Sequence, residues 1–436
     1  MIERLRHALH RRRYRLRYDH LEHLLTLQAL DRAQLLARQQ HDVADIVAFA
    51  AANTSYYAET IGPLLDGSRM PALSELPILK KGDVIQRLDD LLARTADRSQ
   101  AKIGHTGGST GKPLAFWYDD AKHELMRAGM MRSYMLSGWR PGQKILNFWG
   151  ARQDVVPGGV FGTRLDDIIA AEHTIAAFEY TEAQLVEWAR FIQSYRPVLL
   201  QGYASVLSGV ARVVIDNRLR MPGTLIGVYS TAEVLDDSQR QQMEQAFGCK
   251  VFNQYGSREI PNIACECRLG NMHVFTDMVM LESVPLENEN RLLVTSLTNR
   301  LMPMIRYDIG DTGRLLDGEC GCDLPFPLME MELCRQNDLV RTRSGRTVHP
   351  SYFNRLLYGQ TQIRHYQWVQ HDFERLALNL VASRPLGADT LASLASSIRE
   401  DVDAHMRLEV NYLDVIPRTV SGKHRFVISL ADSRKP

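Results

Sequence analysis

The sequence predicts an α/β protein with a large N-terminal domain and a small C-terminal α+β domain. Its 436 residues exceed the length of one typical domain. Strand-like apolar runs alternate with longer helical stretches from about residue 102 to residue 311. This alternation is typical of a sheet covered by helices. A Pro-rich turn at residues 323–327 precedes about a hundred residues with their own strand and helix patterns. We therefore expect domains at 1–334 and 335–436.

The first domain is predicted to begin with a helical segment, at about residues 1–100, followed by an α/β core at about 101–334. Apolar residues recur at helical spacing through Tyr18–Leu36 and again through Val43–Tyr57. Glu75–Leu88 is interpreted as a short loop that enters a helix.

Strands are expected at several apolar runs in the core. Four of them come from apolar runs separated by helical stretches: Lys144–Trp149, Val198–Tyr203, Leu225–Ser230 and Lys250–Tyr255. Two more, Arg291–Leu297 and Met304–Gly310, are predicted to be joined by a turn at Met302–Pro303. For the C-terminal domain the pattern indicates two strands, two helices and a Gly-containing loop near the end.

Charge and hydropathy narrow the class of partner. The formal net charge is +1, so no overall field favours nucleic acid or an anionic membrane as partner. The basic residues gather in His10–Tyr18, which is either a solvated helix face or a surface-binding arm. Neither a secretory signature nor a long uncharged apolar stretch is found, so we expect a cytoplasmic protein without a membrane span. Its six cysteines should then be reduced, and clustered thiols favour metal over disulfides.

The peptide HTGGSTGKP (His105–Pro113) is the most informative stretch. Glycines with interleaved Ser and Thr allow tight turns in which several N–H groups and hydroxyls face one anion, most often phosphate. The peptide is not a Walker loop, because Pro113 follows Gly111–Lys112 and Thr106 stands where the first glycine would be. Taken alone, it is also compatible with a plain flexible loop.

Three later peptides make that plain reading less favourable. NQYGSRE ends a strand with Tyr, Gly and an acid, RYDIGD places an Asp after another strand, and SGK places a Lys near the C-terminus. With ELPILKK, STGKP and YSTAEVL, these peptides in this order resemble the adenylate-forming superfamily, in its phenylacetate-CoA ligase and CapK-like branch. The resemblance covers most of the chain from about Val43 onward. It implies a large α/β domain of the adenylate-forming type and a small, mobile C-terminal domain.

The resemblance also implies roles for individual residues. Ser109, Thr110, Gly111 and Lys112 match the residues that hold the β- and γ-phosphates of ATP. Ala232, Glu233, Asn253, Tyr255, Gly256 and Ser257 match the adenine pocket. Glu259 matches the acid that holds Mg²⁺, Asp311 the acid that binds the ribose hydroxyls, and Arg335 the Arg that supports the ribose at the hinge. Lys423 matches the mobile Lys that stabilises the α-phosphate during adenylation.

The chain departs from the pattern of its relatives at three positions. Arg258 stands where relatives usually carry Ser or Thr directly before the acid. Its guanidinium could hold the α-phosphate, bind a second anionic group of the substrate, or block the usual geometry. Asn337 replaces the common hinge Asp, and Cys334 replaces the Gly before Arg335. The change in orientation between the two domains could therefore differ from that of the relatives.

The cysteines are not spread evenly. Cys267 and His273 are followed about fifty residues later by Cys320 and Cys322, which gives four soft or borderline ligands suited to structural Zn²⁺. The spacing differs from that of a zinc finger but resembles the metal site of several members of this branch. Cys265 is a substitute ligand for Cys267, and a set of buried free thiols is the alternative.

The resemblance implies ATP-dependent activation of a small carboxylic acid to an acyl-adenylate, with release of pyrophosphate and transfer to CoA. A ligase that transfers the acyl group to an amine, a hydroxyl or a carrier protein is the first alternative. A nucleotide-binding scaffold without turnover is the second, because of Arg258. The expected cofactors are ATP, Mg²⁺ and structural Zn²⁺, with CoA as the first candidate acceptor. A homodimer remains open.

Overall fold

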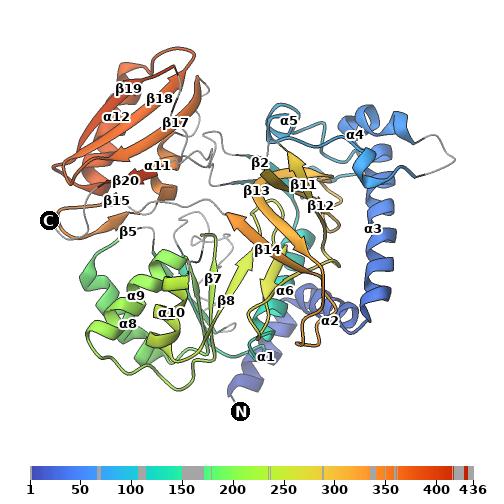
Figure 1. The fold of residues 1–436 in the computed structure, drawn as a ribbon, viewed down its shortest axis with the longest axis horizontal. Helices are drawn as coiled ribbons and strands as arrows, with labels where there is room; N and C mark the ends of the chain where they lie inside the picture. The colour runs from blue at the N-terminus through green and yellow to red at the C-terminus, as the bar shows by residue number, and fades with distance from the viewer. Residues whose placement is uncertain are drawn as a thin grey trace.

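The structure is a computed structural model. It describes residues 2–65, 70–106, 114–149, 171–177, 179–233, 235, 237–286, 289–333, 340–348, 350–357, 360, 362–414, 416 and 427–430. Figure 1 shows a large body made by the N-terminal part of the chain and a smaller body, drawn in orange and red, made by the C-terminal part. The α/β architecture agrees with the fold class predicted from the sequence.

Helices make up the N-terminal segment, as expected: α1 (Ile2–Arg13), α2 (Arg15–Gln28), α3 (Arg32–Asn53), α4 (Ser55–Thr60) and α5 (Lys81–Gln86), with 3-10 turns at Gly62–Leu64 and Leu73–Glu75. The periodic run Tyr18–Leu36 is not one helix. The Asp31 carboxylate accepts a hydrogen bond from the backbone of Gln34, and the Gln34 side chain accepts one from Asp31 N–H. This capping box starts α3 and separates it from α2.

An eleven-stranded sheet forms the centre of the large body. Its strands lie in the order β11-β12-β13-β14-β10-β9-β8-β7-β6-β3-β4. Their bounds are β3 (Ile145–Trp149), β4 (Glu172–Ala176), β6 (Leu199–Gly202), β7 (Gly227–Thr231), β8 (Lys250–Tyr255), β9 (Ala264–Glu266), β10 (Met272–Val274), β11 (Val279–Leu286), β12 (Glu289–Ser296), β13 (Tyr307–Leu316) and β14 (Leu328–Leu333). From β4 to β8 the strands are parallel, and from β8 onward neighbouring strands are antiparallel.

Helices cover both faces of the parallel strands. On one face α8 (Glu182–Tyr195), α9 (Ala204–Asp216) and α10 (Asp237–Phe247) pack on alternate strand residues such as Leu146 and Val228. On the other face α6 (Asp120–Met135) and the N-terminal helices pack on the intervening residues, including Ile145 and Tyr229. Because successive strand side chains point to opposite faces, each buried strand reads as a continuous apolar run.

The connection between β12 and β13 differs from the prediction. The two strands are antiparallel neighbours, with Val294 opposite Tyr307. However, β12 ends at Ser296 and β13 starts only at Tyr307, so residues 297–306 form a loop rather than a tight turn at Met302–Pro303. The loop is fixed to the body because Ile305 N–H donates to the hydroxyl of buried Tyr57 at 2.9 Å.

The C-terminal part has its own sheet, in the order β19-β18-β17-β20, and its own core. Its elements are β15 (Val340–Arg341), β16 (Thr347–Val348), α11 (Pro350–Leu356), β17 (Ile363–Gln370), β18 (Arg375–Ala382), α12 (Ala388–Ser397), a π-helical turn at Ile398–Val402, β19 (Arg407–Tyr412) and β20 (Val427–Ser429). The prediction of two strands was therefore too low. The strands β15, β16 and β20 have only two or three residues each, too few for an alternating pattern to show in the sequence. The boundary at 334/335 lies in 334–339, outside the described residues, and stays a prediction.

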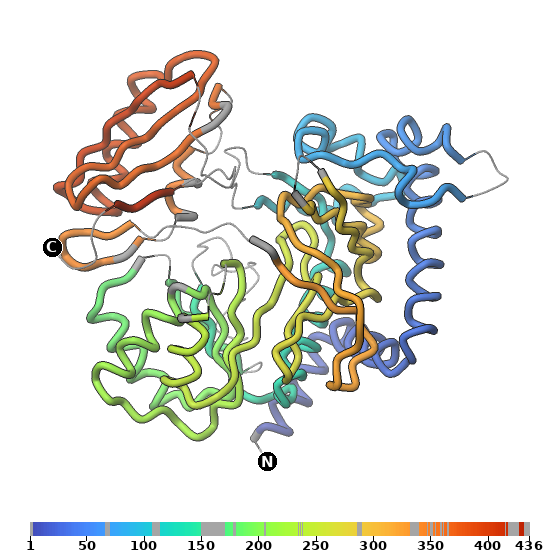
Figure 2. Tube along the Cα trace, in the orientation of Figure 1, coloured from blue at the N-terminus to red at the C-terminus, as the bar shows by residue number. Residues whose placement is uncertain are grey.

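Two small sheets lie beside these. The strands β1 (Lys102–His105) and β2 (Ala115–Tyr118) are an antiparallel pair that flanks the glycine-rich peptide on both sides. The strand β5 (Glu179–Tyr180) pairs with β16, with Tyr180 opposite Thr347. Figure 2 shows this contact as the orange β15–β16 hairpin beside the green segment. Backbone pairing therefore links the two parts of the chain.

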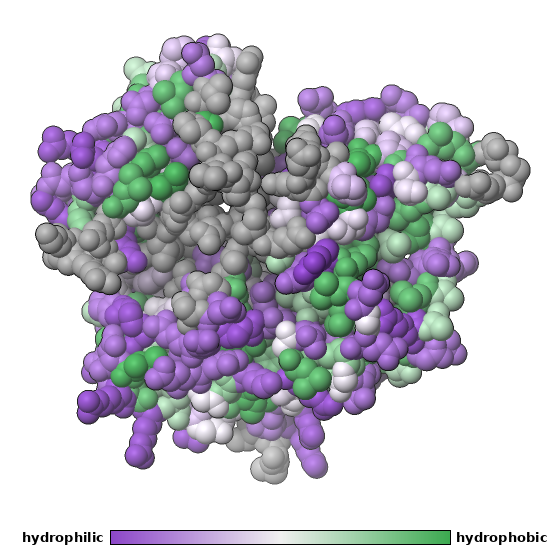
Figure 3. Space-filling view, in the orientation of Figure 1, coloured by the Kyte–Doolittle hydropathy of each residue, from purple (hydrophilic) through white to green (hydrophobic). Residues whose placement is uncertain are grey.

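Hydrophilic side chains dominate the face shown in Figure 3 over α8, α9 and α10, where green patches are small. No helix in the described part of the chain is both long enough and apolar enough to cross a bilayer.

Candidate active site and metal centre

The predicted adenine residues lie at or near the carboxyl ends of the parallel strands β7 and β8, whereas the predicted ribose residue Asp311 lies within the antiparallel strand β13 rather than after a strand. Ala232 and Glu233 follow β7, and Tyr255 ends β8, which pairs with β7 through Thr231 and Gln254. Ligands of open α/β sheets bind at such strand ends. Ala232 has φ of 68°, in the left-handed region that a non-glycine residue adopts only when the surrounding structure holds it there.

Asp311 and Tyr255 are brought together, although 56 positions separate them in sequence. The Tyr255 hydroxyl donates to Asp311 Oδ2 at 3.1 Å, which joins β8 to β13. Asp311 is half-buried. Its side chain is therefore held by one partner while part of it still faces solvent. A carboxylate in that state can accept hydrogen bonds from a pair of hydroxyls.

Glu259 lies in the loop after β8 and is buried, with 6% of its surface exposed. The hydroxyl of Tyr307, the first residue of β13, donates to Glu259 Oε1 at 3.2 Å. The other oxygen, Oε2, is buried and has no hydrogen-bond partner within the described part of the structure. Buried carboxylate oxygens are normally satisfied, so an orphaned one indicates an absent ligand, ion or water.

A tight turn over residues 256–262 connects these groups. Ser257 N–H donates to the Ile260 carbonyl at 2.9 Å, and Ile260 N–H donates to Ser257 Oγ at 3.0 Å. A Cβ atom on Gly256 would lie 2.9 Å from Asn262 N, so no larger residue fits without moving the backbone. The glycine therefore brings Tyr255 and Glu259 into their places.

Arg258 faces the glycine-rich peptide. Its Nη1 donates to the carbonyl of His105 at 2.7 Å. His105 ends β1, two positions before residue 107 of the glycine-rich peptide. The side chain that replaces the usual Ser or Thr is therefore held at the entry to the predicted phosphate loop.

Asn253 is half-buried in β8, on the same side of the strand as Tyr255. Its backbone N–H donates to Glu266 Oε2 at 2.8 Å. Glu266 also accepts a hydrogen bond from Arg240 at 2.7 Å. Burial raises the pKa of Glu266, whereas the bond from Arg240 opposes that shift. This network fixes the position of β8 beside β9.

Several predicted residues cannot be placed. Those outside the described residues are Ser109, Thr110, Gly111, Lys112, Cys334, Arg335, Asn337 and Lys423. Their roles stay predictions.

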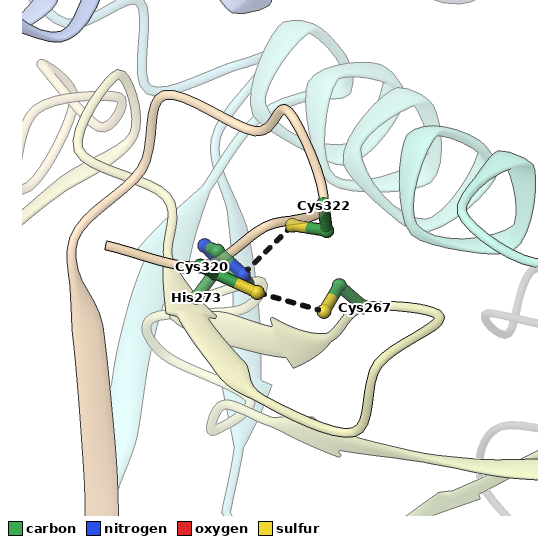
Figure 4. A group of neighbouring side chains, drawn as sticks. All are labelled: Cys267, His273, Cys320 and Cys322. Atoms are coloured by element: carbon green, nitrogen blue, oxygen red, sulfur yellow. Dashed lines mark hydrogen bonds between the residues drawn. The ribbon is translucent and has the colours of Figure 1, made fainter. Parts of the chain in front are cut away.

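The four predicted metal ligands lie together, as Figure 4 shows. Cys267, His273, Cys320 and Cys322 each offer one ligand atom, and these atoms all lie within 4.8 Å of one another. The Cys267 and Cys320 sulfurs are 3.7 Å apart, and Cys322 Sγ is 3.3 Å from His273 Nε2. Among the described residues, the group does not include Cys265. Its thiol is buried and donates to the Glu266 carbonyl at 3.6 Å.

Local contacts favour the metal-binding form of His273. His273 Nδ1 lies 2.9 Å from the Phe326 carbonyl and must donate to it, which leaves Nε2 as the electron-pair donor. Burial lowers the pKa of His273 and so favours the neutral imidazole that binds metal.

The thiols differ from one another. Burial raises the pKa of Cys322 to about 12. Burial also acts to raise the pKa of Cys320, but hydrogen bonds, first of all from Asn271, outweigh it and lower that pKa below its ordinary value. These hydrogen bonds therefore make Cys320 easier to deprotonate than an isolated thiol.

Sequence reasoning missed Tyr307 and the pair formed by Arg132 and Asp277. Tyr307 lies inside the RYDIGD peptide, yet the sequence pattern does not predict that its hydroxyl contacts Glu259. Arg132 and Asp277 form an ion pair with both side chains completely buried. Only the packing of α6 against the loop after β10 brings these two residues together.

Comparison with known proteins agrees with this arrangement. A family model described as the CapK C-terminal domain matches residues 340–430. Protein CapK of Staphylococcus aureus is 25% identical over 398 residues, covering 86% of this chain and 85% of the relative. A phenylacetate-coenzyme A ligase of Thermus thermophilus is 25% identical over 449 residues, covering 93% of this chain and 98% of the relative.

Among solved structures, a 2-hydroxyisobutyryl-CoA ligase in complex with 2-HIB-AMP and CoA has the same fold. Its TM-score is 0.63 at 17% identity, over 93% of this chain and 92% of the other. An open conformation of that ligase gives a TM-score of 0.59 at 16% identity, over 92% of this chain and 93% of the other. The chain belongs to the CapK and phenylacetate-CoA ligase branch of the adenylate-forming enzymes.

Proposed function

We propose that the protein uses ATP to convert a carboxylic acid to an acyl-adenylate, releases pyrophosphate, and then transfers the acyl group to CoA as a thioester. Membership in an AMP-forming branch that includes acid-CoA ligases supports the proposal. The single observation that carries it is the pair of carboxylates, Glu259 and Asp311. A tyrosine hydroxyl holds each of them beside the ends of β7 and β8.

In the proposed site Asp311 accepts hydrogen bonds from the two ribose hydroxyls. Tyr255 fixes the carboxylate through Oδ2, and Asp311 remains half-exposed to receive the sugar. Ala232, Glu233, Asn253, Gly256 and Ser257 would line the adenine pocket, as the family pattern implies.

Glu259 fits the requirements of a Mg²⁺ ligand. It is a buried carboxylate with one oxygen fixed by Tyr307 and the other, Oε2, without a partner within the described residues. A hard cation that keeps several waters and binds phosphate oxygens would complete that oxygen's coordination. When bound there, Mg²⁺ supplies positive charge to the ATP phosphates.

Adenylation requires the substrate carboxylate to attack the α-phosphorus while the bond to pyrophosphate breaks. Negative charge then grows on the non-bridging oxygens, and fixed cations lower the barrier. We assign Lys423 to the α-phosphate, Ser109, Thr110, Gly111 and Lys112 to the β- and γ-phosphates, and Arg335 to the ribose.

We place Arg258 at the α-phosphate, where most relatives use a hydroxyl. Its hydrogen bond to the His105 carbonyl holds the guanidinium at the start of the phosphate loop. A planar guanidinium can bind phosphate through two parallel hydrogen bonds. Arg258→Ser, which restores the usual residue, should therefore change the KM for ATP rather than abolish adenylation.

We further propose that the Cys/His group holds one structural Zn²⁺. Two thiolates bound to a tetrahedral zinc at the usual Zn–S length lie about 3.8 Å apart. The Cys267–Cys320 separation of 3.7 Å fits this value. Three sulfurs and one nitrogen close the tetrahedron, so no position remains for water, and such sites contribute to folding rather than to chemistry.

Two successive assays identify the carboxylic acid substrate and the acceptor of the acyl group. Pyrophosphate exchange should be screened with aryl, fatty, hydroxy and amino acids, and the active acid then tested for AMP release with CoA, amines and carrier protein. Exchange followed by CoA-dependent AMP release supports the proposal. Exchange without CoA dependence selects the amine, hydroxyl or carrier-protein alternative. ATP binding without exchange for any acid selects the scaffold. We also propose that the protein acts inside the cell, where ATP and CoA are available. The homodimer stays a prediction.

A further inference from the structure

The loop that joins β12 to β13, residues 297–306, contacts the outer edge of β2. Asn299, which is 3% exposed, donates its side-chain amide to the Trp117 carbonyl at 3.2 Å. Trp117 N–H donates to the Met302 sulfur at 3.2 Å. Met302 N–H donates in turn to Asn299 Oδ1 at 3.3 Å, which fixes the orientation of the amide. The loop therefore binds both backbone groups of Trp117.

The register of the hairpin formed by β1 and β2 explains why these groups point away from β1. Thr106 N–H donates to the Leu114 carbonyl at 2.9 Å, so these two residues form a hydrogen-bonded pair. In an antiparallel ladder such pairs alternate with pairs whose backbone groups face outward. His105 on β1 and Trp117 on β2 both belong to pairs of the outward type. Each strand therefore offers a backbone carbonyl on the outside of the hairpin.

Arg258 contacts the other edge of the hairpin. Its Nη1 donates to the His105 carbonyl at 2.7 Å, so the loop after β8 holds β1 while the 297–306 loop holds β2. Among the described strands, β1 and β2 pair only with each other. A two-stranded hairpin by itself is at best marginally stable, so the contacts at its two edges fix where it lies.

The 297–306 loop is a fixed support for β2. Ala93 N–H donates to the Leu301 carbonyl at 2.9 Å. Lys122, which lies in the first turn of α6 and is 8% exposed, donates to Thr298 Oγ1 at 2.6 Å. Residues on both sides of Asn299 are thus tied to the large body. Loss of the Asn299 amide would therefore release β2 rather than the loop.

We propose that Asn299 is a positioning residue for the phosphates of ATP. It holds β2, which pairs with β1, and β1 presents the His105 carbonyl to Arg258. A guanidinium that binds phosphate through two parallel hydrogen bonds tolerates little displacement. A shift of the hairpin would therefore move Arg258 away from the α-phosphate. This inference rests on the proposed function, which places Arg258 there.

Isothermal titration calorimetry should compare ATP with adenosine, which keeps the base and the ribose but carries no phosphate. Asn299→Ala should raise the ATP Kd about fivefold, the size expected for one lost hydrogen bond, and leave the adenosine Kd within about twofold. The matched control is Arg300→Ala, at the next residue of the same loop, whose exposed side chain pairs with Asp45 on α3. Because exposed pairs contribute little, this variant should change neither Kd.

A double-mutant cycle tests the route through Arg258. In an Arg258→Ser background, Asn299→Ala should raise the ATP Kd by less than about twofold, because the side chain that Asn299 positions is gone. Circular dichroism checks that each variant is folded. Should Asn299→Ala not fold, Met302→Leu takes its place, since this swap of similar volume removes only the sulfur that accepts from Trp117 N–H. It should raise the ATP Kd and leave the adenosine Kd unchanged.

Three results would overturn the proposal. One is an ATP Kd that a folded Asn299 variant leaves unchanged. A second is an equal rise in the Kd of ATP and of adenosine, which would make Asn299 a residue of general stability only. The third is an effect of Asn299→Ala that persists in full in the Arg258→Ser background. An unchanged protein that binds no ATP would instead refute the proposed function, and this inference with it.

Discussion

Asp311 gives the sharpest test of the nucleotide site. If its carboxylate accepts hydrogen bonds from both ribose hydroxyls, Asp311→Ala removes two charge-assisted bonds, each typically about 1.5 kcal/mol or more. Because Asp311 is half-exposed, solvent lowers that sum, and we expect a loss of about 2 kcal/mol. This corresponds to an ATP Kd raised roughly thirtyfold.

Isothermal titration calorimetry with ATP, 2′-deoxy-ATP and 3′-deoxy-ATP separates the carboxylate from its surroundings. The unchanged protein should bind each deoxynucleotide more weakly than ATP, whereas Asp311→Ala should bind all three alike. Tyr255→Phe keeps the carboxylate and removes the 3.1 Å bond to it, so its Kd should rise about fivefold.

Glu330→Ala is the matched control, because it removes a carboxylate from the adjacent strand β14 that forms an exposed pair with Arg314 at 2.7 Å. Its Kd should not change. A folded Asp311→Ala protein that binds ATP within twofold of the unchanged protein would refute the ribose assignment.

Three further predictions concern the family-implied Lys423, the Cys/His group and the buried ion pair. Lys423→Ala should slow adenylation about a hundredfold while a supplied acyl-adenylate still reacts with CoA, and equal loss in both half-reactions in a quenched-flow assay would exclude a role limited to adenylation. Cys320→Ser should lower zinc content and melting temperature together at near-normal ATP affinity, and elemental analysis that finds no zinc in a stable, unchanged protein would sink the metal assignment. Asp277→Ala leaves Arg132 buried and unpaired, so unfolding of the large domain in urea should need about 3–5 kcal/mol less free energy, against at most about 1 kcal/mol for Glu330→Ala. Equal effects of these two variants would contradict the buried-charge argument.

Much of the fold could be predicted because buried parallel strands form nearly continuous apolar runs in the sequence. Lys250–Tyr255 was predicted with the bounds of β8, since a largely apolar run of six residues directly after a helical stretch favours a buried strand. Helix boundaries were less readable. The break at Asp31 depends on a reciprocal hydrogen bond with Gln34, and apolar periodicity does not register a cap.

The candidate site was predicted residue by residue but not as a geometry. The motif order pointed to Tyr255, Glu259 and Asp311, yet sequence spacing does not show that Tyr255 holds Asp311 while Tyr307 holds Glu259. Those contacts bring β13 close to β8 and to the loop after it, although strands β9, β10 and β14 lie between β8 and β13 in the sheet order. The metal ligands were easier to predict, because thiol and imidazole chemistry limits the alternatives.

The two-residue pairing between β5 and β16 has a consequence for catalysis that depends on domain motion. Val348 lies opposite Glu179 and Thr347 opposite Tyr180, so the C-terminal part is tied to the large body by hydrogen bonds as well as by the chain. At about 0.5–1.5 kcal/mol for each bond, such a short ladder is weak enough for thermal energy and substrate binding to open it. In the proposed mechanism, in which Lys423 moves with the C-terminal domain, this pairing would have to open first, so the rate of its opening would limit how fast Lys423 enters or leaves the site.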